Sequence, residues 1–311
     1  MYRYSLIIPH KNIPDLLQRC IDSIPKREDM QLIIVDDNSD PSVVDFAHFP
    51  GLGLPHTEVY FDKTGKGAGH ARNVGLQHAQ GTWIIFSDAD DTFYTDNFST
   101  LLDTEISDGT KVVFWCINEC YSDGHIVTHK FFDGQGLVRI DSKVPLTYSF
   151  APWRKMVRHD HILAHQLQFE EVMASNDVMF YVRLLVCTDV QDMLYFPLPV
   201  YAWLQRDQSL MHTATLSNAL CRFNVALRAN RLSLQSELGL IDGTSLYLMR
   251  IKKFSTLAFL YGFFKEWSVL GIHYALNDYE TCFDNAAHPW VKNLNIFYVV
   301  RKIKRRIKSL L

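Results

Sequence analysis

Residues 82–91 read TWIIFSDADD, an apolar run that ends in the three aspartates Asp88, Asp90 and Asp91. A short apolar run bounded by polar residues is typical of a strand buried on both faces of a parallel sheet. Carboxylates this close repel one another unless a cation or a set of hydrogen-bond donors neutralises them. Because oxygen ligands suit Mg²⁺ or Mn²⁺ better than Zn²⁺, the stretch predicts a divalent-metal site at the end of a buried strand. An acidic turn exposed to water is the alternative interpretation.

Two similar apolar runs, residues 5–8 and 32–35, lie on either side of a predicted helix that begins near Pro14 and ends before Pro25. Strands that alternate with helices are typical of βαβ units and a parallel sheet. We therefore expect an α/β fold whose ligands bind beyond the carboxyl ends of the strands. The alternation continues with a strand at 59–61, a helix at 68–80, the strand at 83–86, a helix at 97–106 and a strand at 111–115.

The chain of 311 residues divides into three predicted regions. Residues 1–115 hold the regular alternation, residues 116–215 mix apolar and polar segments, and residues 216–311 are a predicted helical C-terminal extension. Residues 296–311 combine apolar residues at helical spacing with six lysines and arginines, which predicts a basic amphipathic helix. Such a helix binds an anionic membrane surface, or it docks on the protein itself as the alternative.

The bulk composition is that of an ordinary globular protein, with 48% hydrophobic and 21% charged residues. A net charge of -3 argues against a nucleic-acid binder. The six cysteines are scattered without a CxxC pair, which favours buried thiols in a reducing compartment over disulfides. The sequence predicts neither a signal peptide nor a membrane span. We therefore expect a cytoplasmic protein that the basic tail can hold at the inner face of the cell membrane.

Several polar segments follow the predicted strands in a recognisable order. They read IIPHKN at 7–12, VDDNS at 35–39, GHARNVG at 69–75 and DADD at 88–91. In this order and spacing, residues 5–91 resemble the family 2 glycosyltransferases of the GT-A fold. The resemblance implies a Rossmann-like, mostly parallel sheet and an inverting transfer from a nucleotide sugar, most often a UDP-sugar. The expected acceptor is a cell-surface polysaccharide or a lipid-linked oligosaccharide.

The resemblance also implies roles for residues on the donor side. Asp37 matches the acidic residue that accepts a hydrogen bond from the nucleotide base, with Asp36 beside it. A carboxylate suits the N–H edge of uracil or guanine, because a charged acceptor gives a stronger bond; an Asx-type turn is the alternative. Arg72 and Asn73 match an Arg-Asn pair that lies near the nucleotide sugar. The other expected nucleotide-sugar contacts are Pro9, Lys11, Asp88 and Arg206.

The segment Asp88-Ala89-Asp90 matches the family's DxD motif. The resemblance assigns Asp88 to the ribose or the metal shell and Asp90 to direct metal coordination, and it leaves the role of Asp91 open. His212 is a further candidate ligand. A Mn²⁺ or Mg²⁺ ion that bridges the two phosphates would stabilise the departing nucleoside diphosphate.

An inverting transfer needs a base to take the proton from the acceptor hydroxyl. Asp177 matches the residue that supplies this base, although Asn176 stands where relatives more often have glutamate. Glu170 and Glu171 are rival candidates, and a helix N-cap is the structural alternative for Asp177. Trp153 matches an acceptor-side segment where an aromatic ring stacks on a sugar, and it is equally consistent with a core tryptophan.

Some features depart from the family pattern. Lys11 stands where many relatives have the aromatic ring that stacks on the base, so Lys11 or His10 must replace that ring. His161 and His165 have the spacing of zinc ligands on one helix face, but the glutamate of HExxH is missing, and we expect a polar face instead.

Two alternatives remain for the function. A sugar nucleotidyltransferase would carry a glycine-rich and basic phosphate loop at the N-terminus, which residues 9–12 are not. A catalytically silent, membrane-recruited nucleotide-sugar-binding module would keep the fold and the tail.

Overall fold

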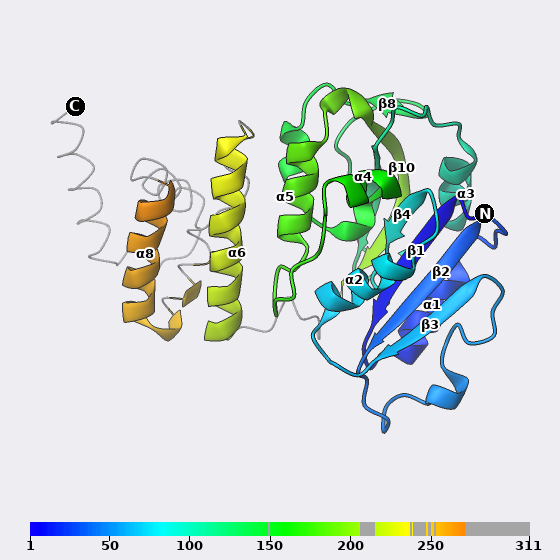
Figure 1. Ribbon diagram of the computed structural model, residues 1–311, viewed down its shortest axis with the longest axis horizontal. Helices are drawn as coiled ribbons and strands as arrows, with labels where there is room; N and C mark the ends of the chain where they lie inside the picture. The colour runs from blue at the N-terminus through cyan, green and yellow to red at the C-terminus, as the bar shows by residue number, and fades with distance from the viewer. Residues whose placement is uncertain are drawn as a thin grey trace. The chain divides into compact units, whose positions relative to one another are not determined.

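The computed structural model describes residues 1–148, 150–205, 215–236 and 253–270, together with the single residues Leu238, Tyr247, Arg250 and Ile251. The chain divides into two compact units, Met1–Thr213 and Ala214–Leu311. The first unit contains one large mixed sheet with helices packed against it (Figure 1).

Four parallel strands make up the N-terminal half of this sheet, in the order β3-β2-β1-β4. β1 and β2 are buried along their whole length, as their apolar runs predict. The register places His10 opposite Asp36, so the strands end together at one edge of the sheet. The bounds are β1 (Tyr4–His10), β2 (Met30–Asp37), β3 (Thr57–Asp62) and β4 (Trp83–Phe86).

Three helices connect or follow these strands. The first begins at Pro14, which is tolerated there because the first helical N–H has no intrahelical partner. The second follows Gly67, whose φ of 93° favours glycine immediately before the helix. Gly75 lets that helix lie directly on β1, because a Cβ at this position would overlap the side chain of Ile7. The bounds are α1 (Pro14–Ser23), α2 (Ala68–His78) and α3 (Thr95–Asp103).

The sheet continues beyond residue 115 in the order β4-β9-β6-β10-β5. β9 is antiparallel to both of its neighbours, whereas β10 runs parallel to β6. Residues 1–115 and 116–215 therefore share one sheet, and residue 115 lies inside β6. The bounds are β5 (Thr92–Phe93), β6 (Val112–Cys120), β7 (Ile126–His129), β8 (Val138–Arg139), β9 (Lys155–Arg158) and β10 (Met193–Leu204), with the helices α4 (His159–Ala164) and α5 (Val178–Cys187).

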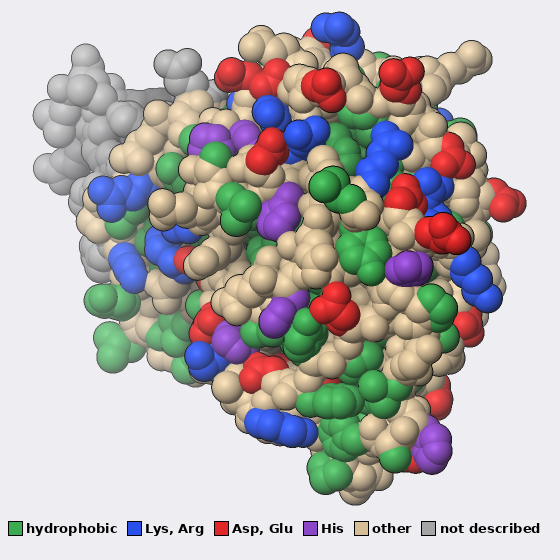
Figure 2. All heavy atoms as spheres, turned by 45° about the vertical axis from the view of Figure 1, so that its right-hand side comes forward, with side chains coloured by type: hydrophobic (Ala, Val, Ile, Leu, Met, Phe, Trp, Pro, Cys, Tyr) green, Lys and Arg blue, Asp and Glu red, His purple; other side chains and the backbone are tan. Residues whose placement is uncertain are grey.

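The surface of the first unit carries charged side chains of both signs, interspersed over the face that Figure 2 shows. Hydrophobic side chains gather toward the lower end of this view, where Figure 1 has the loop with the short helix η1 (Phe46–His48). Four apolar side chains between β2 and the end of β3 are at least about a third exposed: Val43, Leu52, Leu54 and Phe61.

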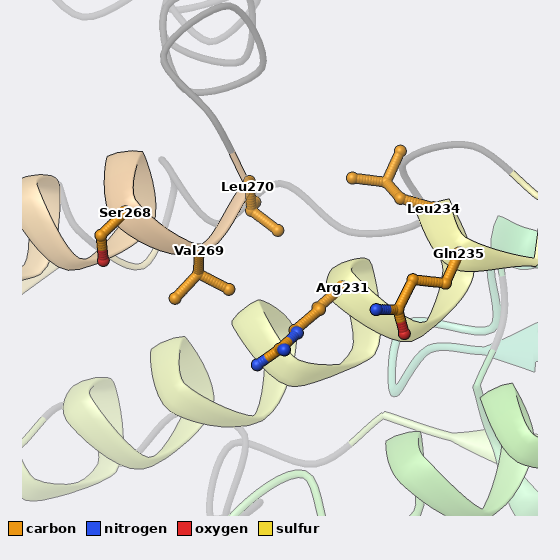
Figure 3. A pocket seen from close by; sticks show the side chains of 6 residues that line it. All are labelled: Arg231, Leu234, Gln235, Ser268, Val269 and Leu270. Atoms are coloured by element: carbon orange, nitrogen blue, oxygen red, sulfur yellow. The ribbon is translucent and has the colours of Figure 1, made fainter.

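The second unit contains α6 (Leu216–Gln235) and α8 (Thr256–Leu270) among its described residues. Thr215 caps α6 by accepting a hydrogen bond from the backbone N–H of Asn218. Side chains of α6 and α8 line a pocket of about 450 Å³ (Figure 3). No helix within the described part of the chain is long and apolar enough to cross a membrane. The basic tail predicted at 296–311 lies outside the described residues.

Candidate active site

The three aspartates that follow β4 lie together at the edge of the sheet. One carboxylate oxygen from each of Asp88, Asp90 and Asp91 lies within 4.8 Å of the others. Asp88 and Asp90 are partly exposed, whereas Asp91 is 1% exposed. Clustered carboxylate oxygens of this kind fit Mg²⁺ or Mn²⁺.

Asp91 differs from the other two aspartates because it is hydrogen-bonded to β10. Its two oxygens accept hydrogen bonds from the hydroxyl of Tyr201 at 3.0 Å and from the backbone N–H of Leu204 at 2.8 Å. Burial, with the neighbouring Asp90 and Asp88, raises the pKa of Asp91 well above its ordinary value. These contacts tie β10 to the end of β4 and favour Asp88 and Asp90 as the ligands that face a metal.

Asp37 lies at the carboxyl end of β2 and is 4% exposed. Its Oδ1 accepts a hydrogen bond from the backbone N–H of Gly67 at 3.0 Å, and its Oδ2 lies 3.3 Å from the Lys11 amine. Lys11 also donates to the backbone carbonyl of Asp37 at 3.0 Å. The lysine at the expected base-stacking position is therefore bound to the expected base-recognition residue. Pro9, also expected here, is buried within β1 opposite Val35.

Asp36 faces the protein interior. It accepts hydrogen bonds from Nδ1 of His10 at 2.8 Å and from the Ser39 backbone N–H at 3.0 Å and hydroxyl at 2.5 Å. Burial alone would raise the pKa of Asp36, but the bonds from His10 and Ser39 outweigh it and hold this pKa below its ordinary value. The His10 ring is 2% exposed and packs edge-on against Phe49, so it is not available to stack on a ligand.

Arg72 connects the aspartate cluster to Asn176, the residue before Asp177. Its Nη2 donates to Asp88 at 2.5 Å and its Nη1 donates to the Asn176 side chain at 3.0 Å. Its Nε is buried and has no partner among the described residues. An unpaired donor beside the acidic cluster fits a bound anion such as a phosphate. Asn73, in contrast, uses its amide to bond both the backbone N–H and the backbone carbonyl of Phe169, each at 2.9 Å.

Asp177 occupies the N-cap position of α5, but its side chain makes no capping hydrogen bond within the described structure. The pKa of Asp177 is raised above its ordinary value, mainly by burial and also by the nearby Asp88, while Arg72 and Lys155 oppose this shift. A carboxylate with a raised pKa suits a general base. Its rival Glu171 is held instead by His70 at 2.7 Å.

The family model described as Glycosyl transferase family 2 matches residues 5–163, about half of the chain. The chain belongs to this family. It is 24% identical to the uncharacterized glycosyltransferase YibD of Escherichia coli (strain K12), over 57% of this chain and 55% of that one. It is 34% identical to the PGL/p-HBAD biosynthesis glycosyltransferase of Mycobacterium bovis (strain BCG), over 29% and 36%. The chain thus spans about half or less of the length of these curated relatives.

The fold is similar to that of solved glycosyltransferase structures. The structure of S. aureus TarS 1-349 in complex with UDP-GlcNAc superposes with a TM-score of 0.62, over 89% of this chain and 80% of that one, at 18% identity. This likeness confirms the predicted GT-A type α/β fold. The family 2 match includes the expected donor-side residues from Pro9 to Asp91, and it ends before Asp177 and Arg206.

Trp153, expected to contact the acceptor, is part of the core of this family 2 protein. Its ring is 6% exposed and stacks on Tyr201 with centroids 4.8 Å apart. This burial favours the core interpretation. Arg206 and His212, expected near the diphosphate and the metal, lie outside the described residues.

Lys155 is a buried cation that the sequence did not single out. It is 1% exposed, donates to the backbone carbonyl of Ala151 at 2.5 Å, and lies 4.3 Å from the centre of the Tyr181 ring. Burial lowers the pKa of Lys155 to about 7, and Asp177 opposes this shift. The sequence signal is weak, because β9 reads KMVR and a lysine at the first position of so short a strand is usually exposed.

His161 and His165 lie together with Cys187, and one potential ligand atom from each lies within 4.8 Å of the others. The sequence pattern did not point to the cysteine. The Thr188 hydroxyl donates its one proton to the Leu184 carbonyl at 2.7 Å. Its contact with Nε2 of His161 at 2.8 Å must therefore be one in which the hydroxyl oxygen accepts and Nε2 donates. Nε2 of His161 then has no lone pair for a metal.

Proposed function

We propose that this chain is a metal-dependent, inverting glycosyltransferase that moves a sugar from a UDP-sugar to a cell-surface polysaccharide or a lipid-linked oligosaccharide. The observation that carries the proposal is the position of Arg72. Its guanidinium bonds Asp88 of the DxD motif and Asn176, the residue before the proposed base. The acidic cluster and the base-bearing segment therefore lie within reach of a single side chain.

On the donor side, Asp37 accepts the uracil N–H and Lys11 lies beside the base. Asp88 and Asp90 would hold Mn²⁺ or Mg²⁺, which supplies positive charge to the diphosphate. The unpaired Nε of Arg72 offers a further donor to a phosphate oxygen. Support for uridine comes from this carboxylate and from the structural neighbour TarS in complex with UDP-GlcNAc, which shares the fold at low identity.

On the acceptor side, Asp177 takes the proton from the attacking hydroxyl. The oxygen then attacks the anomeric carbon from the face opposite the diphosphate, and the bond from that carbon to the phosphate oxygen breaks. The electron pair of that bond leaves with the nucleoside diphosphate. One displacement of this kind inverts the configuration at the anomeric carbon.

The test is transfer and donor hydrolysis with a panel of nucleotide sugars, in Mn²⁺ or Mg²⁺ and in EDTA. We expect turnover with a UDP-sugar that EDTA abolishes, and a loss on the order of 100-fold or more for Asp90→Ala. Asp133→Ala is the matched control, because Asp133 is an exposed carboxylate that lies 3.7 Å from the Lys130 amine. Full turnover of the Asp90 variant would contradict the metal role. Donor binding without turnover would identify a silent binding module instead.

A further inference from the structure

The start of α2 contacts the segment that leads to the proposed base. We call residues 169–177 the base loop. Asn73 bonds both polar groups of the Phe169 backbone, donating from Nδ2 to the carbonyl and accepting from the N–H, each at 2.9 Å. The Phe169 ring stacks on Phe180 of α5, with centroids 4.3 Å apart. The first residue of the base loop is thus fixed to α2 by its backbone and to α5 by its side chain.

A second contact joins the base loop to the sheet through His70. Its Nδ1 lies 2.7 Å from Glu171, and its Nε2 lies 3.1 Å from Asp62 at the end of β3. Because an ionised carboxylate only accepts hydrogen bonds, Nδ1 donates to Glu171. Lys66 faces Glu171 from the other side at 3.4 Å. The imidazole thus bridges the end of β3 and the base loop.

The base loop also closes on itself and packs tightly on α2. The Glu170 N–H donates to the Asn176 carbonyl at 3.1 Å, which brings the two ends of the loop together. A Cβ at Gly69 would overlap the Glu170 carbonyl oxygen, so only glycine permits this approach of α2. Arg72 completes the contact through the Asn176 side chain at 3.0 Å.

We propose that Asn73 and His70 are positioning residues of the transfer reaction, which hold the base loop so that Asp177 faces the metal carboxylates. The inference rests on the proposed role of Asp177 as the base. This positioning role replaces the nucleotide-sugar contact expected of Asn73, because the amide nitrogen and the amide oxygen of Asn73 both bond the Phe169 backbone. A shift of about 1 Å in a catalytic group can cost on the order of 100-fold in rate, so the loss of such a contact affects turnover before it affects donor binding.

The experiment measures UDP affinity in Mn²⁺ by calorimetry and kcat for sugar transfer in Asn73→Ala. We expect kcat to fall about 10- to 100-fold while the UDP dissociation constant stays within about twofold. Asn73→Asp keeps the acceptor for the Phe169 N–H but places a second acceptor against the Phe169 carbonyl, so it should lower kcat as well, and it serves if the alanine variant does not fold. Asn97→Ala is the matched control, because the Asn97 amide donates to the Pro199 carbonyl at 2.7 Å. It should keep wild-type kcat.

A double-mutant cycle separates positioning from a general structural effect. If Asn73 acts through Asp177, then Asn73→Ala added to Asp177→Ala should cause no further loss of the residual rate. Full additivity, or a weakened UDP affinity with unchanged kcat, would overturn the inference and leave the proposed function standing. Wild-type turnover by Asp177→Ala alone would instead overturn the proposed base.

Discussion

At the scale of single residues, each aspartate after β4 is defined by what it contacts. Asp88 pairs with Arg72, and Asp91 accepts bonds from Tyr201 and Leu204. The sequence predicted the acidic cluster from three neighbouring carboxylates. It could not divide their roles, because the partners of Asp91 lie more than a hundred residues away on β10.

Substitution of Asp91 should affect stability, whereas substitution of Asp90 should affect turnover. Asp91→Ala leaves the Tyr201 hydroxyl and the Leu204 N–H without their acceptor, so we expect the free energy of unfolding to fall by about 1–3 kcal/mol. Denaturant unfolding of both variants measures this. If Asp91→Ala unfolds like the wild type and loses only metal-dependent activity, Asp91 is a ligand and not an anchor.

Lys155 should contribute to the pH dependence of the transfer step. Burial raises the pKa of Asp177, and the nearby Lys155 cation opposes this shift. Lys155 is charged below its pKa of about 7. Lys155→Met should therefore raise the pKa of Asp177 further, and the acidic limb of the kcat profile should move to higher pH. Lys143→Met is the control, because this amine donates to the Leu185 carbonyl at 2.7 Å. A limb that stays in place or moves to lower pH would refute this coupling.

At the scale of elements, the apolar runs located β1, β2 and β4, because strands buried on both faces have that signature. The shorter run at 59–61 located β3, which is only partly buried. The apolar runs did not reveal β10, which contains Pro197 and Pro199. Proline cannot donate to a sheet and argues against a strand, unless an irregularity accommodates it. The pairing of β10 with β6 shifts register on both sides of Pro199, which is such an irregularity.

The close approach of α2 to the base loop gives a prediction for Gly69. Gly69→Ala places a methyl group on the Glu170 carbonyl oxygen, so the loop must move. We expect kcat to fall about tenfold or more, with UDP affinity retained. Gly109→Ala is the matched control, since a Cβ there meets nothing within 4 Å. Wild-type kcat in the Gly69 variant would show that the approach is not needed for turnover.

At the scale of the whole molecule, the chain combines a GT-A unit with a second unit in which α6 and α8 pack through a small apolar cluster. The helical character of residues 216–235 and 256–270 agrees with the predicted extension. The packing of these helices depends on contacts between distant residues, which periodicity does not specify.

The basic tail gives a prediction for the intact protein. Residues 296–311 carry six lysines and arginines, each worth on the order of 1 kcal/mol near an anionic surface. We expect the full chain to sediment with phosphatidylserine vesicles at low salt and to be released as salt rises. Charge reversal of Arg305 and Arg306 should weaken this binding, and phosphatidylcholine vesicles are the control. Equal binding to both vesicles would remove the electrostatic role of the tail.

The most direct test of the account is sugar transfer by Asp177→Asn, with the anomeric configuration of the wild-type product determined by NMR. The account predicts an inverted product. It also predicts that the variant binds UDP and Mn²⁺ like the wild type but transfers about 1000-fold more slowly, because the acceptor hydroxyl has lost its base. A product with retained configuration, or a variant that transfers at the wild-type rate, would contradict it.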